Sequence, residues 1–160
     1  MKNILKILLI INCAFLITGC TSDGECRQTV KVSLGVDFYC MELYNDTFEP
    51  RTLTDTVTVF GLNNDSLLAN EKLASNIRLP LKPFATQTTY IFERKNLLPD
   101  TINFIYENEN NFISLECGCL VFHKIIDIEH TYYNIDSVAV TNDFIADDHT
   151  KNIKIYFKKR

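Results

Sequence analysis

The sequence predicts an all-β protein, a single antiparallel β-sandwich of roughly eight to ten short strands that is immunoglobulin-like or related to that fold. Apolar residues recur at every second position in many segments, which is the period of a half-buried strand. Clusters of Asn, Asp, Pro and Gly interrupt these segments about every 8–12 residues, a spacing typical of sandwiches and barrels. No repeat or linker divides the chain, so we expect one domain.

The clearest alternation lies in Gln28–Val36, where Val30, Val32 and Leu34 would share one face, and Phe38–Cys40 extends it. We expect further strands at Thr56–Leu62, Asn76–Leu81, Thr86–Glu93, Thr101–Glu107, Phe112–Glu116, Cys119–Ile128, Asn134–Thr141 and Asn152–Lys158.

Three stretches do not alternate. Asn45–Asp55 contains Asn, Asp, Glu and Pro50 and is interpreted as a long loop. Glu107–Asn111 is polar and rich in Asn, so we expect a turn there. Ser66–Ala74 fits either a short helix or a brief strand, and the sequence leaves both open.

The first twenty residues have the features of a bacterial lipoprotein export signal. Lys2 and Lys6 accompany an apolar core, Ile7–Ile17, that is too short to span the ~30 Å of a bilayer's hydrocarbon. The end of the segment, Ile17-Thr18-Gly19-Cys20, resembles a lipobox, whose cysteine receives diacylglycerol before the chain is cleaved in front of it. We therefore expect a signal peptide over residues 1–19, a lipidated tether over 20–25 and the folded domain over 26–160.

The composition narrows the classes of partner. The formal net charge is −4, and loss of Lys2 and Lys6 with the signal would make the mature chain more acidic. An acidic surface argues against nucleic acid as a partner. The chain has 7 Tyr and 11 Phe but no Trp, which weakens the case for a sugar-stacking platform, although Tyr90, Tyr132 and Tyr133 could take the place of Trp. No pattern calls for a cofactor.

Four cysteines remain after the signal and the lipidated Cys20 are set aside, and outside the cytoplasm such a set favours two disulfides. Four cysteines allow three pairings, and a bridge between Cys117 and Cys119 would strain a very short loop. Of the two remaining pairings we favour Cys26–Cys117 with Cys40–Cys119.

A metal site is the alternative use of this region. On an extended strand Cys117, Cys119 and His123 would project from the same face, which could hold a soft metal ion. The spacing is not that of a zinc knuckle, and Val121 lies within the cluster, so we expect no metal and a packed or hydrogen-bonded His123.

A short pattern of Asp, hydroxyl residue and aliphatic residue occurs four times in the sequence. It resembles the O-glycosylation acceptor of exported Bacteroidota proteins, and it also fits a turn that enters a strand, where Asp and Ser or Thr hydrogen-bond the backbone. The candidate acceptors are Thr56, Ser66, Thr101 and Ser137.

Several segments resemble a family of small Bacteroidota lipoproteins, domain-of-unknown-function family 6452, across nearly all of the mature chain. The matching segments are Phe112-Ile113-Ser114-Leu115-Glu116-Cys117-Gly118, Phe122-His123, Ile135-Asp136-Ser137-Val138 and Asn152-Ile153-Lys154-Ile155-Tyr156-Phe157. The resemblance implies an exported β-rich protein, and no reaction, because the family has no assigned activity. Cys40 and Cys119 depart from its pattern, which supports a second bridge between them.

The sequence thus predicts a lipid-anchored protein of the cell envelope, most simply at the outer membrane, that acts as a non-enzymatic accessory or binding module for an envelope protein or glycan. The alternative is a hydrolase of envelope glycans or peptides that uses a pair of carboxylates, which only a structure could bring together.

Overall fold

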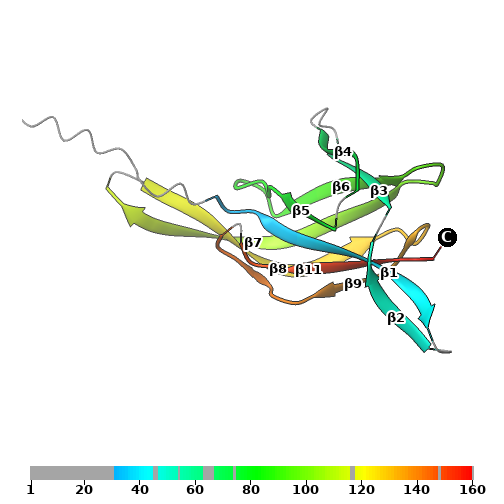
Figure 1. Ribbon diagram of the computed structural model, residues 1–160. Helices are drawn as coiled ribbons and strands as arrows, with labels where there is room; N and C mark the ends of the chain where they lie inside the picture. The colour runs from blue at the N-terminus through cyan, green and yellow to red at the C-terminus, as the bar shows by residue number, and fades with distance from the viewer. Residues whose placement is uncertain are drawn as a thin grey trace, which may run out of the picture.

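The computed structural model describes residues 31–44, 47–53, 55–62, 67–73, 75–115, 118–147 and 149–159. Within these ranges the chain is all-β, as the sequence predicts, and forms eleven strands in two sheets (Figure 1). None of the described residues belongs to a helix, so the described part contains no helix that could cross a membrane.

The first sheet, sheet A, is centred on β1 (Leu34–Tyr44) and β11 (Ile153–Phe157). Beyond β11 lies β9 (Ile135–Val140), and the other edge of β1 pairs with β5 (Asn76–Leu79) and then β2 (Thr47–Thr52). β1 and β11 are parallel, whereas the other pairs in the sheet are antiparallel. The expectation of a purely antiparallel sheet is therefore wrong for this central pair.

The second sheet, sheet B, is antiparallel throughout. Its strand order is β10 (Phe144–Ile145), β8 (Gly118–His130), β7 (Asp100–Ser114), β6 (Gln87–Arg94), β3 (Thr56–Gly61) and β4 (Leu67–Leu73). Figure 1 shows the far ends of β7 and β8 reaching beyond the other strands as a two-stranded arm.

One hydrophobic core joins the two sheets. Alternate residues of β1 and β11 are fully buried, and they meet buried residues of β3, β6 and β7. Phe38 of sheet A contacts Phe92 of sheet B with ring centroids 6.1 Å apart in an edge-to-face arrangement. Phe38 also meets Phe157 at 5.8 Å, so one aromatic residue links β1, β11 and β6.

A buried carboxylate organises the connection between β8 and β9. Asp100, at the start of β7, is 1% exposed and accepts four hydrogen bonds. Its Oδ1 accepts from the Thr131 hydroxyl and the Tyr133 amide, both at 2.9 Å. Its Oδ2 accepts from the amides of Asn134 at 2.8 Å and Ile135 at 3.2 Å. The carboxylate thereby replaces the backbone partners that this loop lacks.

A buried asparagine likewise provides hydrogen bonds to backbone groups, at the end of sheet A where β1 and β11 begin. The Asn152 side chain accepts a hydrogen bond from the Gly35 amide at 3.0 Å and donates to the carbonyls of Asn142 and Phe144. Gly35 itself has no room for a side chain, because a Cβ there would collide with the Thr150 carbonyl and the Arg78 guanidinium. These contacts hold the start of β1 against β11 and the β10 segment.

Two sequence-based expectations of secondary structure are corrected, and one open alternative is decided in favour of a strand. Asn45–Asp55 is not a long loop, since it contains β2, whose Pro50 is tolerated because β2 pairs on one side only. Glu107–Asn111 is not a turn, because it continues β7 through its pairing with β8. The ambiguous Ser66–Ala74 stretch contains strand β4.

The start of the first strand also differs from the expectation. The sequence predicts a strand from Gln28, but β1 begins at Leu34, and residues 31–33 are not in a strand. The predicted signal peptide, the lipidated tether and residues 26–30 lie outside the described residues.

Candidate functional site

The solvent-facing side of sheet A carries the polar and aromatic residues of its two central strands. Val36 and Phe38 of β1 point into the core, so Asp37 and Tyr39 point away from it. The same alternation in β11 buries Ile155 and turns Lys154 and Tyr156 outward. The parallel register then places Asp37 beside Lys154 and Tyr39 beside Tyr156. We call this surface, made of Asp37, Tyr39, Met41, Lys154, Tyr156 and Lys158, the tyrosine face.

Two tyrosines stack at the centre of the tyrosine face. The rings of Tyr39 and Tyr156 lie with their centroids 5.5 Å apart and their planes 28° from parallel. The Lys154 ammonium lies 5.7 Å from the Tyr39 ring centroid, within range of a cation–π contact. Both tyrosines are half-buried, which fixes the rings while leaving part of each in solvent.

A hollow of about 410 Å³ lies next along the strands, at Met41 and Lys158, which follow Tyr39 and Tyr156 by two residues. It is lined by Met41, Asp136, Lys158 and Lys159. The register of β9 and β11 shifts beside Phe157, so Asp136 is an extra residue between two paired positions, a β-bulge. Bulges redirect side chains, and this one brings a carboxylate to the hollow.

The other end of the tyrosine face is occupied by an ion pair. Lys151 Nζ lies 2.8 Å from Asp37 Oδ2, and the Asp37 side chain is only 7% exposed. The hydrogen bond to this carboxylate raises the pKa of Lys151. A smaller hollow of about 120 Å³ lies beside the pair, between β1 and the residues around Ser75 and Asn76.

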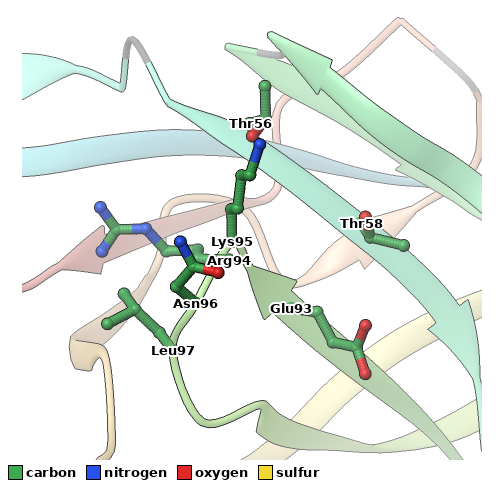
Figure 2. Close-up of a pocket in the computed structure, with 7 residues that line it drawn as sticks. All are labelled: Thr56, Thr58, Glu93, Arg94, Lys95, Asn96 and Leu97. Carbon is green, nitrogen blue, oxygen red and sulfur yellow. The ribbon is translucent and has the colours of Figure 1, made fainter.

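A second large hollow, of about 420 Å³, lies on sheet B where β6 turns towards β7 (Figure 2). Its lining is polar apart from Leu97, with Thr56, Thr58, Glu93, Arg94, Lys95 and Asn96. Figure 2 shows the Arg94 guanidinium pointing away from Thr58 and Glu93. The charged groups left at the hollow, Glu93 and Lys95, have opposite signs.

The Arg94 side chain points away from the hollow because its guanidinium is hydrogen-bonded to groups outside it. It contacts Asp55 Oδ2 through Nη2 at 2.9 Å and through Nε at 3.2 Å, and Nη1 donates to the Lys158 carbonyl at 3.3 Å. The guanidinium carbon also lies 5.2 Å from the Phe157 ring centroid. Arg94 therefore ties sheet B to the end of β11 and is a structural residue.

The carboxylates near these hollows lie apart. Glu93 lines the hollow of Figure 2, Asp136 lines the hollow beside the tyrosines, and Asp37 lines the smallest one. Both oxygens of the buried Asp100 carboxylate already accept hydrogen bonds, four in all, from the segment that leads into β9. Each of these three hollows thus holds one carboxylate.

The predicted bridge between Cys40 and Cys119 is wrong, because both thiols are free. Cys40 lies in β1 between Arg51 and Phe157, whereas Cys119 lies opposite Phe112 near the tip of the β7–β8 arm. Figure 1 shows the arm and the β1–β2 hairpin at opposite ends of the molecule. Cys26 and Cys117 lie outside the described residues, so their bridge stays a prediction.

The two free thiols should differ in reactivity. Burial raises the pKa of the Cys40 thiol, and only the thiolate reacts, whereas Cys119 is exposed. We expect iodoacetamide at pH 8 to modify Cys119 at least about tenfold faster than Cys40. Peptide mass spectrometry of timed samples gives both rates, with denatured protein as the control in which they converge. Equal native rates, or a Cys119 that reacts only after reduction, would contradict the structure.

The proposed metal ligands do not converge among the residues that the structure describes. Cys119 and His123 are four positions apart on β8, which separates them by about 13 Å along an extended strand. His123 is buried, its Nδ1 lies 2.7 Å from Asn108 Oδ1, and burial lowers its pKa. No three His, Cys, Asp or Glu side chains in the described ranges are grouped closely enough to bind one metal ion, and Cys117 lies outside them.

The candidate O-glycosylation positions have different surroundings. Thr56 and Thr101 are half-buried at the starts of β3 and β7, and Asp55 Oδ1 accepts the Thr56 amide at 2.8 Å. Ser137 is exposed on β9, and its hydroxyl lies 3.4 Å from Asp136 Oδ2. Ser66 lies outside the described residues. Modification at these four positions stays a prediction.

Sequence reasoning missed the tyrosine face. Each strand separately shows a tyrosine on its polar side, Tyr39 after Phe38 and Tyr156 after Ile155. That alternation was the available signal, but it does not indicate that β1 and β11 are neighbours or that they run in parallel.

Comparison with known proteins identifies the family. Neither the curated proteins nor the solved structures include a match to the chain. A family profile described as "Family of unknown function (DUF6452)" matches residues 56–157, which run from the start of β3 to the end of β11. The match covers more than half of the chain, and the chain therefore belongs to the DUF6452 family of unknown function.

Proposed function

We propose that this protein is a lipid-anchored, non-enzymatic binding module of a bacterial cell envelope, most simply at the outer membrane of a member of the Bacteroidota. The anchor is supported by the lysines, the short apolar core and the Ile17-Thr18-Gly19-Cys20 motif of the amino-terminal sequence. The fold would serve as a β-sandwich scaffold that presents a rigid, solvent-facing surface.

The observation that favours binding over catalysis is the tyrosine face. Its stacked rings, its lysines and its adjoining hollow of about 410 Å³ are features of the kind that ligand-binding sites use. The buried polar groups Asp100, Asn152 and Arg94, which could otherwise do chemistry, are each occupied by several hydrogen bonds within the protein.

Replacement of Cys20 tests the anchor. In a Bacteroidota host fed an alkyne fatty acid, the wild-type protein should become labelled, and Cys20→Ala should lose the label completely because no other thiol is at the lipobox. The variant should also keep residues 1–19, since cleavage follows lipidation. In-gel fluorescence measures the label, and intact-mass spectrometry measures the cleavage.

Cys13→Ala is the matched control, because it removes a cysteine from the apolar core of the same signal. It should leave labelling and cleavage at the wild-type level. Label retained in Cys20→Ala, or lost equally in Cys13→Ala, would refute lipidation at Cys20.

A further inference from the structure

We propose that the tyrosine face and its adjoining hollow bind an acidic saccharide, a sugar chain that carries carboxylate or phosphate groups. This inference rests on the proposed function as a binding module and names the class of ligand.

The stacked tyrosines supply the surface for a sugar ring. One face of the Tyr156 ring is turned to Tyr39, and the stacking fixes its orientation. On its other side the neighbours across the sheet belong to β9, where Ser137 lies opposite Tyr156 and Ala139 lies opposite Lys154. These side chains are too short to cover the Tyr156 ring. Aromatic rings with a polar tip suit a ligand that is partly apolar and partly wet, as sugar rings are.

The charges around the rings select an anion. Lys154, Lys158 and Lys159 gather here on a chain whose formal net charge is −4. Lys158 Nζ donates one hydrogen bond to the Tyr132 carbonyl, and an ammonium has three donors, so two remain for a ligand. A local excess of positive charge attracts and orients acidic ligands and disfavours cationic ones.

The hollow supplies the site for the charged group of the saccharide and for the hydroxyl groups beside it. Its volume of about 410 Å³ falls in the range of small-molecule sites, and Met41 gives it an apolar wall. Asp136, which the bulge in β9 brings to the hollow, is a strong hydrogen-bond acceptor that lines the hollow together with Lys158 and Lys159. A carboxylate that accepts hydrogen bonds suits a ligand with free hydroxyl groups. Rings, lysines and this acceptor together favour a saccharide over an acidic peptide.

Isothermal titration calorimetry on the mature lipidated protein in detergent micelles tests the class of ligand. The probes are an oligogalacturonate, a neutral galactose oligomer of the same length and an oligoglutamate peptide of the same charge. We expect the oligogalacturonate to bind at least about tenfold more tightly than either other probe at 50 mM salt, and more weakly at 500 mM.

Variants locate the site. Lys158→Gln combined with Lys159→Gln should weaken oligogalacturonate binding about tenfold or more. Tyr156→Ser should weaken it by a similar factor, and circular dichroism shows whether each variant remains folded. Lys82→Gln is the matched control, because Lys82 is an exposed lysine in the loop between β5 and β6. It should bind as the wild type does.

The outcomes separate this inference from the proposed function. Equal binding of the neutral oligomer would overturn the preference for acids, and equal binding of oligoglutamate would replace the saccharide by an acidic peptide. A loss in Lys82→Gln equal to that in the double variant would show unspecific attraction and overturn the site. No binding by a protein that is folded and labelled at Cys20 would overturn the ligand class and leave the membrane anchor standing. Binding by a protein that carries no lipid would support the ligand class and overturn the membrane anchor.

Discussion

Asp100→Asn should lower the free energy of unfolding by about 3 kcal/mol. The carboxylate is 1% exposed, and each of its two oxygens accepts two hydrogen bonds from the segment between β8 and β9. An asparagine has one acceptor oxygen and one NH2 group, so in either orientation at least one of these backbone amides faces a donor. An unsatisfied buried group costs its full desolvation energy, and hydrogen bonds to a charged acceptor are the stronger kind.

Urea denaturation followed by far-ultraviolet circular dichroism measures this change. Asp143→Asn is the matched control, because Asp143 is exposed in the loop before β10, and it should stay within about 0.5 kcal/mol of the wild type. Unchanged slopes against urea would show that the variant alters stability and not the extent of unfolding. A stability of Asp100→Asn equal to that of the control would mean that the four hydrogen bonds contribute nothing net.

The sequence could predict the strands that are half buried. In β3, β6 and the first part of β7, buried and partly exposed residues alternate, and the period-two signal of the sequence is the direct result of that burial. The far part of β7 lacks this alternation, since most of residues 107–112 are exposed and paired only with β8. Backbone pairing holds these residues in a strand, so their side chains carry no core pattern and the Asn-rich stretch resembles a turn.

The sequence could not predict which strands are neighbours. β1 and β11 are separated by more than a hundred residues, and an alternating pattern is the same for a parallel and an antiparallel neighbour. The pairing of Cys40 with Cys119 failed for this reason, because it assumed that two distant strands lie side by side. The tyrosine face could not be predicted for the same reason, since Tyr39 and Tyr156 meet only through the parallel register of β1 and β11.

Asn152→Ala should lower the free energy of unfolding by about 3–4 kcal/mol. The side chain is fully buried and satisfies three backbone groups, the Gly35 amide and the carbonyls of Asn142 and Phe144. Alanine would leave these groups without their side-chain partner, and the missing amide would leave a small void in the core. Asn152→Asp should cost at least as much, because its carboxylate would face the two carbonyls to which the amide group donates.

Asn110→Ala is the matched control for this loss, since Asn110 is exposed on the arm, and it should change stability by less than about 0.5 kcal/mol. Urea denaturation gives the global values, and hydrogen exchange at the Gly35 amide gives a local one, because this amide donates to Asn152 Oδ1. In Asn152→Ala the hydrogen-exchange rate of the Gly35 amide should rise by more than the fall in the global free energy of unfolding explains. Wild-type protection at Gly35 would mean that another acceptor replaces Oδ1. The junction matters beyond its own energy, because it holds the start of β1 against β11 and so sets the register that brings the two tyrosines together.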